Sequence, residues 1–281
     1  MYKPEIAIII PTIYRDDLLM KCIESIIEHM DMDKTKIFII DQNNFEYDSE
    51  EKRIFYETAC ARAHTYENRQ IEVIRVPFNS GISYCRNVGV QAAYEQQIPY
   101  CIISADSIVF NQSMNNINDL IIFLERCTVD LIGLKLENRI PWEAKLNLIE
   151  KSHFEIEYIT KIRETRWATI CDTENRETYY LWECDIVKNF FIAKTSSLMQ
   201  TGWDRELLMA EHEDFFWRFK QNGFKVVYSE SSAGIYIGEN SKKDGKEYSK
   251  LRQGNWQHSL QKLKEKYNLK KWIGYKNKPN E

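Results

Sequence analysis

IAIIIPTIYRDDLLMKCIESII, residues 6–27, changes its hydrophobic pattern once, at Pro11 and Thr12. Residues 6–10 form an unbroken apolar run, which suits a buried strand and is too short for a signal-peptide core or a membrane span. After Thr12, apolar side chains recur three and four positions apart, which is the spacing of one helix face. The stretch therefore predicts a strand, a loop and a helix, the first unit of an α/β fold.

The same unit recurs through the first half of the chain. Further strands are expected at residues 37–40, 71–76 and 100–103, and helices at residues 83–97 and 115–127. Strands that alternate with helices at this spacing predict a parallel sheet covered on both faces. Ligands bind beyond the carboxyl ends of such strands, and those ends carry Thr12, Asp41, Asn79 and Asp106.

The second half has a less regular pattern. It predicts a strand at residues 129–136, a charged and partly helical segment at 140–166, a strand at 185–193, a helix at 206–221 and a last strand at 224–228. No internal repeat or low-complexity linker separates the halves. We therefore expect one compact unit of two lobes, residues 1–110 and 111–238, followed by a basic helical tail at residues 239–281.

Composition and charge narrow the class of protein. A chain of 281 residues, 43% of them hydrophobic, can bury a sizeable core. The net charge of -4 gives no reason to expect nucleic acid as a partner. The cysteines are odd in number, scattered and never spaced as Cys-x-x-Cys, which indicates reduced thiols. We therefore expect a cytoplasmic protein.

The tail has the opposite charge to the rest of the chain. From Lys242 onward there are twelve basic and four acidic residues, with Trp256 and Trp272 among them. Such a segment suits an anionic membrane surface or a phosphate-bearing acceptor. A solvated C-terminal helix is the alternative interpretation.

Phosphate binding would need side chains or a metal, because the chain has neither a P-loop nor a Gly-x-Gly-x-x-Gly motif. Arg86 lies near the start of an expected helix, where a guanidinium and the helix terminus both attract phosphate. A structural pair with a carboxylate is the alternative. Asp106 follows an apolar strand and is either a turn or cap residue or a ligand for a hard divalent cation.

A third group of candidates is Glu211-His212-Glu213-Asp214, which runs into an aromatic block at residues 215–217. At helical spacing Glu211, Asp214 and Arg218 share one face, and His212 shares another with Phe215 and Phe216. A carboxylate at a helix start is well placed as a general base toward a hydroxyl. A charge cluster favoured by the helix dipole, with His212 simply packed, is the alternative.

Taken in order, five segments resemble the family 2 glycosyltransferases and related GT-A enzymes over about residues 5–230. These segments are IIIPTIYRDDLLMKCIESI (8–26), DQN (41–43), NSGISYCRNVGVQAA (79–93), SADS (104–107) and GWDRELLMAEHEDFFWRFKQNGFKV (202–226). The order is more specific than any one segment. DIVKNFFIAKTSSL (185–198), followed by EHEDFF, also resembles the β1,4-N-acetylgalactosaminyltransferases, which suggests an N-acetylhexosamine donor.

The resemblance implies a GT-A fold, in which residues 1–110 bind the nucleotide sugar and residues 111–238 bind the acceptor and carry catalysis. It places Thr12 and Asp41 at the nucleoside, Arg86 at the base or diphosphate, and Asp106 on Mg²⁺ or Mn²⁺. The donor-binding set is Pro11, Thr12, Asp41, Asn79, Arg86, Ala105 and Asp106, and the catalytic candidates are Glu211, His212 and Asp214.

Two departures from the family pattern bear on this site. Ser104 occupies the first acidic position of the Asp-x-Asp motif, which makes a weak or absent metal site an open alternative. The family's catalytic aspartate falls on His212, so either the imidazole is the base or a shifted helix register gives that role to Asp214 or Glu211.

We therefore expect an inverting glycosyltransferase that uses a nucleotide sugar, with a UDP sugar favoured, and a glycan or lipid-linked acceptor. Polysaccharide biosynthesis in the cytoplasm or at the inner face of the membrane fits these features. One alternative is a nucleotidyltransferase on a related sheet, which the carboxylate and aromatic cluster at residues 211–219 disfavours. A non-catalytic nucleotide- or sugar-binding protein is the other.

Overall fold

The structure, a computed structural model, describes residues 3–65, 70–139, 143–149, 152–158, 166–170, 178–238, 245–270 and 273–276. Within these ranges the strands form a central sheet in the order β3-β2-β1-β4-β11-β6-β12-β10-β9, with β5 attached to β12. A second, three-stranded sheet has the order β13-β8-β7.

Four parallel strands form the first half of the central sheet. They are β1 (Ile6–Thr12), β2 (Thr35–Asp41), β3 (Ile71–Arg75) and β4 (Tyr100–Ile103), and β1 lies between β2 and β4. Every residue of β1, β2 and β4 is buried, as expected for strands covered on both faces. The strand predictions for this half are confirmed, and the carboxyl ends of the strands meet at one edge.

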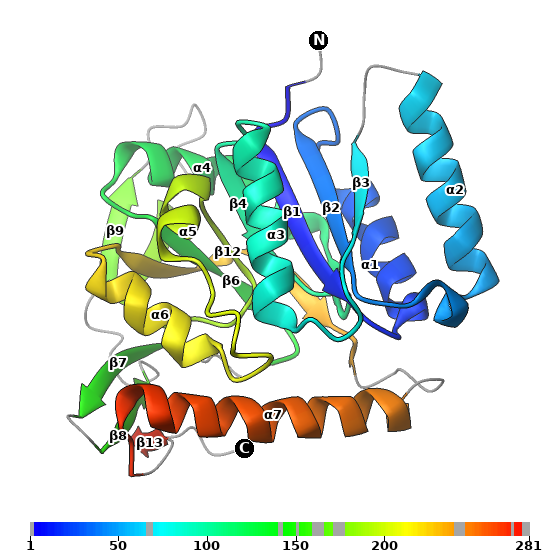
Figure 1. The fold of residues 1–281 in the computed structure, drawn as a ribbon. Helices are drawn as coiled ribbons and strands as arrows, with labels where there is room; N and C mark the ends of the chain where they lie inside the picture. The colour runs from blue at the N-terminus through cyan, green and yellow to red at the C-terminus, as the bar shows by residue number, and fades with distance from the viewer. Residues whose placement is uncertain are drawn as a thin grey trace.

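Helices cover both faces of this sheet (Figure 1). One face carries α1 (Asp16–His29) and α4 (Ile117–Arg126); the other carries α3 (Ile82–Glu95), α5 (Thr195–Thr201) and α6 (His212–Gln221). The close packing of α3 requires Gly89, since a Cβ there would lie 2.5 Å from Cγ2 of Ile9. The helix α2 (Glu50–Thr65), which was not predicted, packs beside β3.

The second half makes the central sheet mixed. The strand β11 (Phe191–Lys194) is antiparallel to β4 and to β6 (Leu131–Leu136), and β12 (Val226–Tyr236) is parallel to β6. The sheet continues through β10 (Thr178–Cys184) and β9 (Arg166–Ile170), while β5 (Ile108–Phe110) pairs with β12. Residues 185–190 were expected in a strand but lie outside it, in an irregular segment before β11 that forms one isolated bridge, between Ile186 and Ala144.

The prediction of a partly helical segment at residues 140–166 is wrong for the residues that the structure describes. They form β7 (Ala144–Ile149) and β8 (His153–Tyr158), and β8 pairs in parallel with β13 (Ile273–Lys276). Leu146, Phe154 and Ile156 are buried between polar neighbours, which is the alternation of a half-buried strand. This period of two was the signal that sequence analysis passed over.

The C-terminal helix α7 (Gly245–Tyr267) runs along the edge of the molecule at which β1 and β2 end (Figure 1). Leu263 is fully buried against Leu207 and Ala210, and the N–H of Met209 donates to Oγ of Ser259 at 3.0 Å. This helix is therefore packed into the fold. No helix in the described part of the chain is long and apolar enough to cross a bilayer.

Candidate functional site

A pocket of about 480 Å³ lies at the carboxyl edge of β1 and β4, beside α7. Seven residues of the predicted site line it, from segments far apart in the chain: Pro11, Thr12, Asn79, Arg86, Ala105, Glu211 and His212. The other three, Asp41, Asp106 and Asp214, are completely buried and do not line it.

The first turns of two helices reach this pocket. Gly81 and Ile82 at the start of α3, and Glu211 to Glu213 at the start of α6, line its wall. Gly81 has a φ of 88°, and a Cβ on it would lie 2.8 Å from Cα of Leu208, so the close approach of the start of α3 to the loop before α6 requires glycine. Helix N-termini attract anions through their N–H groups and dipoles.

A buried polar network joins the two helix starts. Nη1 of Arg86 donates to Oε1 of Glu211 at 2.5 Å, and Nδ2 of Asn189 donates to the same oxygen at 3.1 Å. Arg86 therefore pairs with a carboxylate while it also lines the pocket. The role of Asn189 was not predicted, because it comes from the segment that sequence analysis assigned to a strand.

This network sets the tautomer of His212. Oδ1 of Asn189 lies 2.9 Å from Nδ1 of His212, and because the amide nitrogen already donates to Glu211, the imidazole Nδ1–H donates to the amide oxygen. Nε2 then carries a lone pair. Burial lowers the pKa of His212 to about 3, so the ring is neutral near pH 7, and its edge packs on Phe216.

Glu213 and Asp214 occupy different environments although they are neighbours in sequence. Glu213 lines the pocket and is 6% exposed, and burial raises its pKa to about 8. Asp214 lies at the opposite side of the helix start, where Arg218, Lys266 and the Tyr267 hydroxyl contact it at 2.7 to 2.9 Å. The pocket therefore receives Glu213, which belongs to the candidate cluster at residues 211–214 but was not one of the named catalytic residues Glu211, His212 and Asp214.

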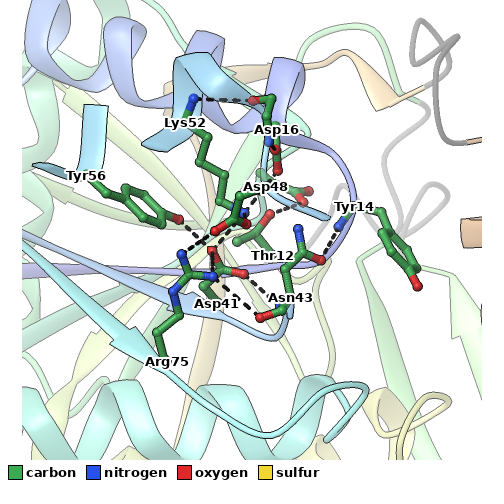
Figure 2. Close-up of polar contacts among 11 residues, drawn as sticks. Thr12, Tyr14, Asp16, Asp41, Asn43, Asp48, Lys52, Tyr56 and Arg75 are labelled. Atoms are coloured by element: carbon green, nitrogen blue, oxygen red, sulfur yellow. Dashed lines mark hydrogen bonds and ion pairs between the residues drawn. The ribbon is translucent and has the colours of Figure 1, made fainter. Parts of the chain in front are cut away.

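Asp41 belongs to a buried charge cluster next to the pocket (Figure 2). Its carboxylate contacts Lys52 at 2.8 Å and Arg75 at 3.3 Å, and it accepts hydrogen bonds from the Tyr56 hydroxyl and the Asn43 N–H, both at 2.8 Å. All three of the carboxylates around Lys52, which are Asp16, Asp41 and Asp48, lie within 3.0 Å of its Nζ. The cluster ties together the loops after β1 and β2.

Asp106 is also enclosed by its neighbours. Its Oδ2 accepts a hydrogen bond from the Thr12 hydroxyl at 3.0 Å, and its Oδ1 forms a salt bridge with Arg15. Ser104, at the other end of the motif, has a buried hydroxyl without a hydrogen-bond partner among the described residues. No group of three or more His, Cys, Asp or Glu side chains suited to a metal occurs in the described ranges. The side chains here do not fit a divalent cation.

The helix α7 adds residues to the pocket that sequence analysis had placed in a tail. Tyr248, Arg252, Asn255 and Trp256 all line it. The Arg15 guanidinium stacks over the Tyr248 ring at 4.2 Å, and Nη1 of Arg252 donates to the Tyr248 hydroxyl at 3.4 Å. The cationic and aromatic composition of the segment is visible in the sequence. The position of the helix beside the sheet edge is not.

The mixed sheet, with its pocket at the carboxyl edge of the parallel strands, is the GT-A fold of glycosyltransferases. Residues 7–114 match the family described as Glycosyl transferase family 2. This match confirms the resemblance seen in the sequence over that range. No curated protein sequence matches the chain significantly.

Solved structures of low sequence identity share the fold. S. aureus TarS 1–349 in complex with UDP-GlcNAc is 14% identical with a TM-score of 0.54, over 82% of this chain and 57% of that one. The mannosyltransferase PcManGT from Pyrobaculum calidifontis, in complex with GDP-Man and Mn²⁺, is 12% identical with a TM-score of 0.59, over 94% and 65%. GalNAc-T7 with UDP, GalNAc and Mn²⁺ is 12% identical with a TM-score of 0.56, over 83% and 43%. The chain thus spans less than two thirds of each.

Proposed function

We propose that this protein is an inverting glycosyltransferase that moves a sugar from a nucleotide donor to a hydroxyl of a glycan or lipid-linked acceptor. The observation that carries the proposal is the pocket, which is lined by two helix N-termini, by two arginines, Arg15 and Arg252, and by a buried acid, Glu213. The helix N-termini and the arginines suit a diphosphate. The carboxyl group of Glu213 suits the removal of a proton from an attacking hydroxyl.

The proposed donor is a UDP sugar carrying a hexose or an N-acetylhexosamine. The TarS structure contains UDP-GlcNAc and the GalNAc-T7 structure contains UDP and GalNAc, whereas PcManGT contains GDP-Man. In our proposal residues 1–110 hold the donor through the loops after β1, β3 and β4, and residues 111–238 present the acceptor side. Pocket contacts, not the fold, determine which sugar is used.

In the proposed reaction the acceptor oxygen attacks the anomeric carbon while the bond from that carbon to the diphosphate oxygen breaks. The hydroxyl proton passes to a base, and the nucleoside diphosphate leaves with the bonding electron pair. The N-termini of α3 and α6 stabilise the departing negative charge. Mn²⁺ accompanies two of the similar structures, but the side chains around Asp106 do not fit a cation and no step requires one.

Within the cluster at residues 211–214, Glu213 is the group best suited to accept the proton. Glu211 is committed to Arg86, and Asp214 faces away from the pocket. His212 lines the pocket, but a pKa of about 3 makes it a weak base. A carboxylate whose pKa is about 8 is a much stronger base once it is ionised.

We expect Glu213→Gln to lower turnover by roughly 100-fold or more, because it removes the base and keeps the shape of the side chain. Binding of the nucleoside diphosphate should persist. Wild-type turnover should rise with pH through about 8 as Glu213 ionises. Steady-state kinetics across this pH range measure both effects, and Glu206→Gln, at an exposed glutamate outside the pocket, is the matched control. Near-normal turnover of Glu213→Gln would exclude it as the base.

The function itself is tested by incubating the protein with UDP and GDP sugars and measuring release of the nucleoside diphosphate, in Mn²⁺, Mg²⁺ and EDTA. Release that depends on a glycan or lipid-linked acceptor supports glycosyl transfer. Release of pyrophosphate from a nucleoside triphosphate and a sugar phosphate would identify a nucleotidyltransferase instead. Binding without any turnover would identify a non-catalytic nucleotide- or sugar-binding protein.

A further inference from the structure

We propose that Arg15 and Arg252, in place of a divalent cation, bind the diphosphate of the bound nucleotide. This inference rests on the proposed function and concerns the donor side of the same pocket. A metal would be expected beside Asp106. The guanidinium of Arg15 already occupies that position.

Arg15 brings a guanidinium, ion-paired with Asp106, to the lining of the pocket. It is 8% exposed, lines the pocket and is anchored by its salt bridge to Asp106. Its buried Nε–H has no hydrogen-bond acceptor among the described residues. A buried donor without a partner is costly, and a phosphate oxygen in the pocket would remove that cost.

The same contact weakens Asp106 as a metal ligand. Both carboxylate oxygens are already in use, one by Thr12 and one by Arg15. Hard divalent cations bind through several oxygen ligands, and Ser104 supplies no second carboxylate. A cation at Asp106 would have to displace the guanidinium that already provides the positive charge.

Arg252 approaches from α7, separated by 237 positions in sequence from Arg15. The Tyr248 ring lies under the Arg15 guanidinium, and its hydroxyl accepts the hydrogen bond from Arg252. Tyr248 thus contacts both guanidinium groups, and its contact with the exposed Arg252 is at the long end of hydrogen-bond distance. Guanidinium groups bind phosphate through two parallel N–H donors, so two of them suit the two phosphates of a nucleoside diphosphate.

The test is calorimetric titration of the intact protein with UDP and GDP, in EDTA and in Mn²⁺. We expect the Kd for the bound nucleotide to change by less than about threefold between the two conditions. Arg252→Gln should weaken binding in EDTA by about tenfold or more, the loss expected for a charged hydrogen bond. Arg126→Gln, at an exposed arginine of α4 outside the pocket, should have no effect.

A second variant, at Arg15, tests whether the loss of binding in Arg252→Gln reflects more than a structural change. Arg15→Lys keeps the charge beside Asp106 and loses the forked donors, so it should weaken nucleoside diphosphate binding by about tenfold or more while its thermal unfolding stays cooperative. The matching nucleoside, without phosphates, should bind wild type and both variants alike. Should Arg15→Lys fail to fold, Arg252→Gln alone decides.

The outcomes separate this inference from the proposed function. Nucleotide binding that requires Mn²⁺ overturns the inference and leaves the function standing. Binding in EDTA that neither variant weakens also overturns it. If the wild type binds no nucleoside diphosphate in either condition, the inference and the proposed function both fail.

Discussion

Glu213 shows how one buried side chain links the chemistry of the pocket to the stability of the protein. Burial raises its pKa from the usual 4.5 to about 8, because the ionised form loses its hydration, and the nearby Glu211 and Asp214 charges add to the rise. The folded state therefore holds this proton more tightly than the unfolded state. The contribution of Glu213 to the free energy of unfolding is fully present below pH 4.5 and is lost as the pH rises through about 8.

We expect Glu213→Gln to remove this pH-dependent loss of stability. The melting temperature of the variant should match that of wild type near pH 4.5 and exceed it increasingly up to pH 9, since glutamine releases no proton. Thermal unfolding of both proteins across this range measures the difference, in which the other titrating groups largely cancel. Parallel pH profiles for the two proteins would show that Glu213 titrates normally in the fold.

At the scale of elements, the site depends on how closely the starts of α3 and α6 approach each other. Gly81 lets the start of α3 lie against Leu208, in the loop before α6, and the buried pair of Arg86 with Glu211 connects the two helix starts. The two residues of the pair are 125 positions apart. The contact therefore joins the two halves of the chain at the pocket wall.

We expect Gly81→Ala to destabilise the protein by about 1–3 kcal/mol, because the new Cβ would meet Leu208 and the backbone has a positive φ. Gly254→Ala is the matched control. It lies within α7 with nothing near its Cβ, so alanine there should be neutral or stabilising by up to about 1 kcal/mol. Chemical denaturation measures both. Equal effects of the two changes would contradict this account of the helix starts.

At the scale of the whole molecule, α7 is both a wall of the pocket and a basic helix, with six basic and two acidic residues. Lys262 and Lys266 form ion pairs with Glu206 and Asp204, so these lysines serve the fold. Peripheral binding to an anionic membrane, where a lipid-linked acceptor would be found, remains our proposal for other charges of the helix. Deleting residues 242–281 cannot test it, because the deletion would uncover Leu207 and Ala210.

We expect the double change Lys250→Gln and Lys264→Gln to reduce flotation with phosphatidylglycerol vesicles by about 30-fold in partition coefficient, because each lysine near an anionic surface contributes on the order of 1 kcal/mol. Added salt should reduce flotation of wild type in the same way. Lys21→Gln with Lys34→Gln, on α1 and before β2, is the control of equal charge. If both double variants float like wild type, α7 is not a membrane-binding helix.

The sequence alone was sufficient for the first half of the fold, because hydrophobic periodicity is a local property. The run at residues 6–10, the helix pattern after it and its repeats identified β1, α1, β2, β3, α3 and β4. Parallel strands place their carboxyl ends at one edge. Thr12, Asn79 and Ala105 could therefore be assigned to one site before any contact was known.

Only the tertiary structure decided which charged groups face that site. Asp106 is enclosed because Arg15 reaches it from 91 positions away, and Arg252 joins the pocket because α7 folds back across the sheet edge. The start of α6 at His212 turns Glu213 toward the pocket and Asp214 toward Tyr267. These arrangements depend on partners distant in sequence, whose approach is set by packing and ion pairing in the folded chain, and no local pattern records them.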